Sequence, residues 1–175
     1  MKVLIVSLPR TGSTNLLLSL GRLLNLKTYS EPFEKKYVGE DYKFNQPHII
    51  KTMINDLKVN PLDFDKVIIL ARKDLKAQLE SFTFALKNDK WHENYKVNDI
   101  EIVKEYYYNF NAMRLNIEKL SKEINIPITW YEDLYSGNKN LVLDTIKLWN
   151  LRLEYKYLKE FIDPIKKYRK TGTLV

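Results

Sequence analysis

The chain has 175 residues, of which 45% are hydrophobic and 29% are charged, and its net charge at pH 7 is +7. This length and composition are typical of one globular domain, so we predict that residues 1–175 form a single domain. The absence of cysteine excludes disulfides, thiolate metal sites and a cysteine nucleophile. The two histidines, His48 and His92, are too isolated in the sequence to predict a histidine-based metal site.

The distribution of charge and apolar residues narrows the choice of partners and compartment. The lysines are spread along the chain, which indicates a solvated surface more than a nucleic-acid-binding face. No apolar run approaches the length of a membrane span, and the first predicted strand leaves no room for a signal peptide. Together with the lack of cysteine, these features predict a cytoplasmic protein without a membrane span.

Apolar runs and helical periodicity predict alternating strands and helices. The first strand covers Val3–Ser7, an unbroken apolar run of the kind buried on both faces in parallel sheets. A helix follows from about Thr14, its N-cap, to Leu24. The later predicted strands cover 26–29, 47–54, 67–71 and 126–131, and the later helices cover 74–87, 99–123, 141–151 and 155–162. This alternation predicts a three-layer α/β/α fold resembling P-loop NTPases, with a mostly parallel sheet, a central first strand and a basic tail from about residue 164.

The loop between the first strand and the first helix predicts an anion site. Such a loop directs backbone N–H groups and a helix N-terminus at a negatively charged group. The side chains add hydroxyl donors and one permanent positive charge. An ordinary strand-to-helix turn is the alternative. The residues assigned to the anion are Arg10, Thr11, Gly12, Ser13, Thr14 and Asn15.

Comparison with the nucleotide-binding pattern G-x-x-x-x-G-K-[ST] limits the chemistry at this loop. Gly12 fits the second glycine, but Ser13 stands where a kinase or NTPase has its lysine, and the cation lies at Arg10 instead. A phosphotransferase would lose its main transition-state charge by this change. The strand 67–71 ends in Arg72, where a P-loop NTPase carries an aspartate for Mg²⁺. The pattern therefore predicts a second anion and no metal.

Several segments resemble the sulfotransferases that use 3′-phosphoadenosine 5′-phosphosulfate (PAPS). The sequence from Pro9 to Thr14 resembles their 5′-phosphosulfate-binding loop. Residues 67–74, followed by Ser81, resemble their 3′-phosphate segment, with an arginine at a strand end and a serine in the next helix. Residues 130–134 resemble the Y-E-D-L turn, whose tyrosine lies against adenine, and residues 168–172 resemble the R-K-G loop that closes over the 3′-phosphate.

The resemblance implies roles for residues in each segment. PAPS would be the donor and adenosine 3′,5′-bisphosphate (PAP) the product. The loop would bind the 5′ end, and Tyr131 would lie against the adenine. The 3′-phosphate would be bound by Arg72, Ser81, Arg169 and Lys170.

The resemblance also implies where the catalytic base lies. Ile50-Lys51-Thr52 resembles the K-T-H segment, but Met53 replaces the histidine that is the base in the cytosolic branch. Branches that sulfate carbohydrates use a glutamate after the second strand, and Ser30-Glu31-Pro32 resembles that segment. Glu31 is therefore the expected base, with Glu34 as the reserve candidate.

The resemblance thus implies transfer of a sulfuryl group from PAPS to a hydroxyl of a small molecule, a glycan or a peptide. Arg10, Lys51 and Glu31 are the predicted catalytic residues. Positioning and charge stabilisation dominate this type of transfer, so the cations matter most. The alternatives are a P-loop phosphotransferase and a non-catalytic basic module that binds nucleotides or nucleic acid.

Overall fold

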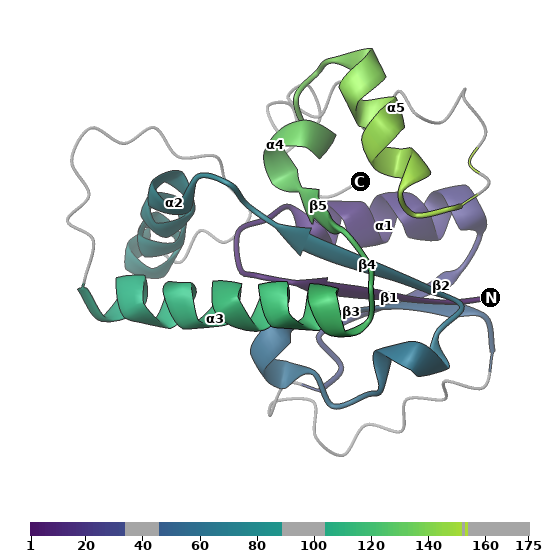
Figure 1. Ribbon diagram of the computed structural model, residues 1–175, viewed down its shortest axis with the longest axis horizontal. Helices are drawn as coiled ribbons and strands as arrows, with labels where there is room; N and C mark the ends of the chain where they lie inside the picture. The colour runs from purple at the N-terminus through teal and green to yellow at the C-terminus, as the bar shows by residue number, and fades with distance from the viewer. Residues whose placement is uncertain (34–45, 89–103, 152, 154–175) are drawn as a thin grey trace.

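The computed structural model describes residues 1–33, 46–88, 104–151 and 153, which form helices around one sheet (Figure 1). No helix in this part of the chain is both long and apolar enough to cross a membrane. The elements are, in chain order, β1 (Lys2–Ser7), α1 (Ser13–Leu24), β2 (Lys27–Ser30), β3 (His48–Met53), the 3₁₀ turns η2 (Ile54–Asp56) and η3 (Pro61–Asp63), β4 (Lys66–Ala71), α2 (Leu75–Asn88), α3 (Lys104–Glu123), β5 (Ile128–Trp130), α4 (Tyr131–Leu134) and α5 (Lys139–Lys147).

The sheet has five parallel strands in the order β2-β3-β1-β4-β5. The predicted parallel sheet with a central first strand is confirmed. Ile5 in β1 is aligned with Lys51 in β3 and with Ile68 in β4. The carboxyl end of β1 therefore lies between the ends of β3 and β4, and any loop that follows these strands shares one edge of the sheet.

Alternation along β1 builds a core on each face of the sheet. Val3 and Ile5 pack in a cluster with α1, α4 and α5, whereas Leu4 and Val6 pack with α2 and α3. All four side chains are fully buried, because both faces of the central strand are covered. Figure 1 shows α1 and α5 on one side of the sheet and α3 on the other. The fold is the expected three-layer α/β/α arrangement.

Some boundaries differ from those expected from the sequence. The strand expected over 126–131 covers only Ile128–Trp130, because Tyr131 begins the short helix α4. The helix expected over 141–151 begins earlier, where the Asn138 side chain accepts hydrogen bonds from two backbone N–H groups, and it ends at Lys147. The helix expected over 155–162, the basic tail and residues 99–103 lie outside the described residues.

A close contact fixes α1 against β2. Gly21 lies so near β2 that a Cβ atom there would be 2.3 Å from Cγ2 of Thr28. Alanine normally favours a helix over glycine by about 1 kcal/mol. The clash is expected to outweigh this gain.

Gly21→Ala is expected to lower the free energy of unfolding by about 1–3 kcal/mol, the usual cost of overpacking. Thr28→Ser removes Cγ2 and should recover most of the loss in the double variant. Urea unfolding of the parent, the two single variants and the double variant measures both effects. Stability equal to the parent in Gly21→Ala, or no recovery in the double variant, would show that the contact does not limit this packing.

Candidate anion-binding site

The candidate site lies at the carboxyl edge of the sheet, where the strand order reverses. The chain passes from β1 to β2 and β3 on one side, while β4 and β5 lie on the other side. Ligands of open parallel sheets bind outside such a reversal point. The loops after β1 and β4 both leave the sheet here, and they carry Arg10 and Arg72.

The loop after β1 has a constrained backbone. Arg10 and Gly12 both have positive φ angles, of 62° and 71°. Gly12 is the N-cap of α1, and its carbonyl accepts a hydrogen bond from the Leu16 N–H at 3.0 Å. The prediction that Thr14 is the N-cap is therefore wrong. Because the helix begins earlier, Thr14 lies in the first turn of α1.

Three side chains hold carbonyl oxygens of this loop. The Thr11 hydroxyl donates to the Leu8 carbonyl at 2.8 Å. The amide nitrogen of Gln78, in α2, donates to the Pro9 carbonyl at 2.6 Å. The Tyr135 hydroxyl, just after α4, donates to the Gly12 carbonyl at 3.1 Å. The loop is thus fixed by its own Thr11, by α2 through Gln78 and by the segment just after α4 through Tyr135.

The Arg10 side chain reaches from the loop to α2. Its Nε donates to the Ser81 Oγ at 2.7 Å, and Ser81 is almost completely buried. The sequence interpretation assigned Ser81 to the same phosphate as Arg72, whereas in the structure the Ser81 hydroxyl accepts a hydrogen bond from Arg10. An anion beside the loop would therefore have the guanidinium and this hydroxyl as neighbours.

A buried lysine joins β3 to the loop and to the end of β2. Lys51 is 2% exposed, and its Nζ forms an ion pair with Glu31 and donates to the Thr14 Oγ1 at 3.3 Å. Glu31 follows β2, has a φ of 53°, and donates its backbone N–H to the Lys51 carbonyl at 2.7 Å. The strand β3, the end of β2 and the first turn of α1 thus bring an ammonium group, a carboxylate and a hydroxyl together.

The second cation, Arg72, is held by α4. Its guanidinium lies over the Tyr131 ring, 4.6 Å from the centroid, and its Nε is 3.5 Å from the Glu132 Oε1. Glu132 also accepts the backbone N–H groups of Lys73, at 2.8 Å, and Asp74, at 3.2 Å. Arg72 therefore has a fixed orientation and a carboxylate close to its charge.

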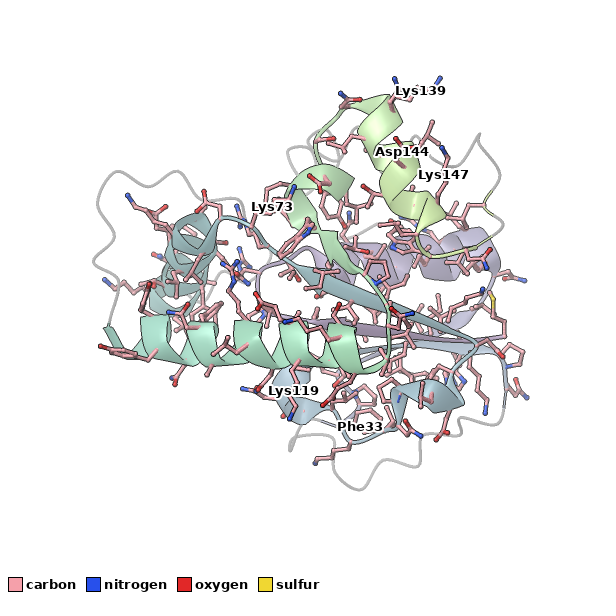
Figure 2. All side chains as sticks on the ribbon, in the orientation of Figure 1. Phe33, Lys73, Lys119, Lys139, Asp144 and Lys147 are labelled. Atoms are coloured by element: carbon pink, nitrogen blue, oxygen red, sulfur yellow. The ribbon has the colours of Figure 1, made fainter. Side chains whose placement is uncertain are left out.

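The neighbouring lysine has a similar partner. The Lys73 Nζ donates to the Asp133 Oδ1 at 2.6 Å, and Figure 2 shows Lys73 beside α4 on the loop that leads into α2. Two cations after β4 thus face two carboxylates on α4. The positive charges of Arg72 and Lys73 are therefore partly offset by Glu132 and Asp133, whereas the sequence interpretation considered only the cation that would bind a second anion.

Tyr131 lies between the two ends of the site. Its ring centroid is 5.0 Å from that of Tyr135, and its Cε2 would be 3.3 Å from a Cβ atom at Gly12. The same ring lies under the Arg72 guanidinium. Tyr131 therefore lies next to both the loop after β1 and the cation after β4.

The other predicted site residues fall into two groups. Ser13 and Asn15 are buried in the first turn of α1, and Thr11 is fully buried with its hydroxyl directed at the Leu8 carbonyl. Glu34, Arg169 and Lys170 lie outside the described residues.

Sequence reasoning did not find Gln78, Glu132 or Tyr135. Gln78 had a visible signal, because it is a polar residue within an apolar stripe that includes Leu75, Leu79 and Phe82. It also lies three residues before Ser81, on the same face of α2. Glu132 and Tyr135 gave no comparable signal, because their partners are more than fifty residues away.

In the part of the chain that the structure describes, no group of three or more His, Asp or Glu side chains is arranged to hold a metal ion. Comparison with protein-family models gave no match, and a search of curated proteins found no significant match.

Proposed function

We propose that this protein transfers a sulfuryl group from PAPS to a hydroxyl of an acceptor. The proposal rests mainly on the junction of Lys51, Glu31 and Thr14 beside the loop after β1. A cation that is buried in a parallel sheet and directed at an anion-binding loop suits a reaction in which charge develops on a leaving phosphate. A carboxylate at the same point suits removal of a proton from a hydroxyl.

In the proposed reaction, Glu31 is the base, and the cations and loop N–H groups stabilise the leaving group. The acceptor oxygen attacks the sulfur while its proton passes to the Glu31 carboxylate. The bond between the sulfur and the bridging oxygen of the 5′-phosphate breaks, and PAP leaves with the electron pair. Arg10, Lys51 and the loop N–H groups stabilise the charge on the leaving phosphate. Because sulfuryl transfer resembles phosphoryl transfer, positioning and charge supply most of the rate enhancement.

The other end of the donor would lie across Tyr131. The adenine would lie against its ring, and the Arg72 guanidinium, which covers one face of that ring, offers a cation for the 3′-phosphate. Glu132 takes part of the Arg72 charge, so we expect the 3′-phosphate to contribute less binding energy than the 5′ end. The acceptor is proposed only as a hydroxyl of a small molecule, a glycan or a peptide.

A thermal-shift experiment tests the proposal against the alternatives. PAP, ADP and ATP are compared with and without Mg²⁺. At one hundred times its Kd, PAP should stabilise the folded protein by about 2.7 kcal/mol, with or without Mg²⁺. Stronger stabilisation by ATP with Mg²⁺ would instead indicate a phosphotransferase. No response to PAP, together with salt-sensitive binding of DNA or RNA, would indicate a nucleic-acid-binding module.

A further inference from the structure

Two side chains from outside the loop after β1 hold its carbonyl oxygens. We propose that Gln78 and Tyr135 are positioning residues that direct the backbone N–H groups of the loop at the bound anion. This inference rests on the proposed function, in which the anion is the 5′ end of PAPS. Neither residue is expected to touch the reacting atoms; each acts through a peptide group of the loop.

The Gln78 contact sets the direction of the Arg10 N–H. The Pro9 carbonyl accepts from the Gln78 amide at 2.6 Å, so this carbonyl is turned toward α2. The described peptide bonds are all trans, and in a trans peptide the N–H points away from the C=O. The N–H of the Pro9–Arg10 peptide must therefore point away from α2.

The Tyr135 contact acts in the same way on the peptide group between Gly12 and Ser13, at the start of α1. The Gly12 carbonyl accepts from the Tyr135 hydroxyl at 3.1 Å and from the Leu16 N–H at 3.0 Å. The N–H of the Gly12–Ser13 peptide then points in the opposite direction, out of the N-terminus of α1. The Tyr135 ring is packed so closely on Gly12 that a Cβ atom there would be 2.8 Å from its Cε2.

The chemistry of Gln78 favours a role beyond packing. Its side chain is fully buried, and its Oε1 has no hydrogen-bond partner among the residues that the structure describes. An apolar side chain of similar volume would fill this space without burying an unpaired oxygen. What only an amide provides here is the N–H donor to the Pro9 carbonyl. One turn farther along α2, Ser81 binds the Arg10 side chain, so α2 fixes both the backbone and the side chain of the loop.

The test uses two variants that each remove one donor and preserve shape. Gln78→Met and Tyr135→Phe are compared with the parent and with Tyr107→Phe, a matched control on the exposed side of α3. Calorimetry measures the Kd for PAP, inorganic pyrophosphate and adenosine 3′-monophosphate. Each variant should bind PAP and pyrophosphate about tenfold more weakly, as expected for one lost hydrogen bond. Binding of the 3′-monophosphate, which has no 5′ anion, should change less than about twofold on the same scale.

The stability readout separates positioning from a structural role. The melting temperature of each variant should stay within about 3 °C of the parent. Unchanged binding of PAP and pyrophosphate, or equal losses for all three ligands, would overturn the inference. If the parent binds pyrophosphate but not PAP, the proposed function fails, and the positioning roles are decided by pyrophosphate alone. A parent that binds neither anion would overturn both.

Discussion

Arg10→Ala is expected to lower kcat at least about a hundredfold, the usual loss when one preorganised charge donor is removed. Arg10 lies in the loop after β1, where its Nε donates to Ser81, and its guanidinium is the permanent positive charge that the proposed function places beside the leaving phosphate. PAP release from PAPS is measured with phenolic and carbohydrate acceptors. The Kd for PAP should rise in parallel.

The control for this variant is Arg22→Ala, which removes the same charge from the last turn of α1, at the opposite end of that helix from the loop. It should retain the parent's kcat and Kd. Both variants should unfold cooperatively. Parent-like turnover in Arg10→Ala, or an equal loss in Arg22→Ala, would remove Arg10 from the proposed site and leave only an effect of net charge.

Lys51 and Glu31 are expected to contribute unequally to stability and equally to activity. Lys51 is 2% exposed, whereas Glu31 is 24% exposed. Glu31→Gln leaves a buried ammonium group without its counter-charge and should lower the free energy of unfolding by about 3 kcal/mol. Lys51→Met leaves a carboxylate that water can still reach, so it should cost less. Each single variant should lose about two orders of magnitude in kcat.

The double variant separates the two effects. Glu31→Gln with Lys51→Met removes both charges, and its stability should return close to that of the parent because no buried charge remains unpaired. Its activity should remain as low as in the single variants. Urea unfolding and PAPS turnover of all four proteins test this cycle. Recovery of activity in the double variant, or no loss of stability in Glu31→Gln, would contradict the assignment.

The fold was predictable because its signals are local. Val3–Ser7 and Val67–Ala71 are unbroken apolar runs, and the structure pairs both strands in parallel at the centre of the sheet. The loop after β1 was found for the same reason, since Pro9 and Gly12 mark it within a few residues of the strand. The helix expected from residue 74 was also predictable from a local signal, because the Asp74 side chain accepts from the Ala77 N–H at 2.9 Å, at the start of α2.

The pairings within the site were not predictable, because they join distant segments. The sequence showed Arg72 as a cation at a strand end, but nothing in it revealed that Glu132 would lie beside it. The resemblance to sulfotransferases assigned Ser81 to the same phosphate as Arg72, whereas in the structure its hydroxyl accepts a hydrogen bond from Arg10, seventy-one residues earlier. The strand expected through Tyr131 was too long, because propensity does not show that α4 must turn there to cover the loop.

The most direct test of the central claim is an experimental structure of the protein with PAP bound. We expect the 5′-phosphate within hydrogen-bonding distance of the Arg10 guanidinium and the loop N–H groups, with Lys51 adjacent. The adenine should lie on Tyr131 and the 3′-phosphate at Arg72. A bound nucleotide that touches only one of these two arginines, or that lies away from the carboxyl edge of the sheet, would contradict the account.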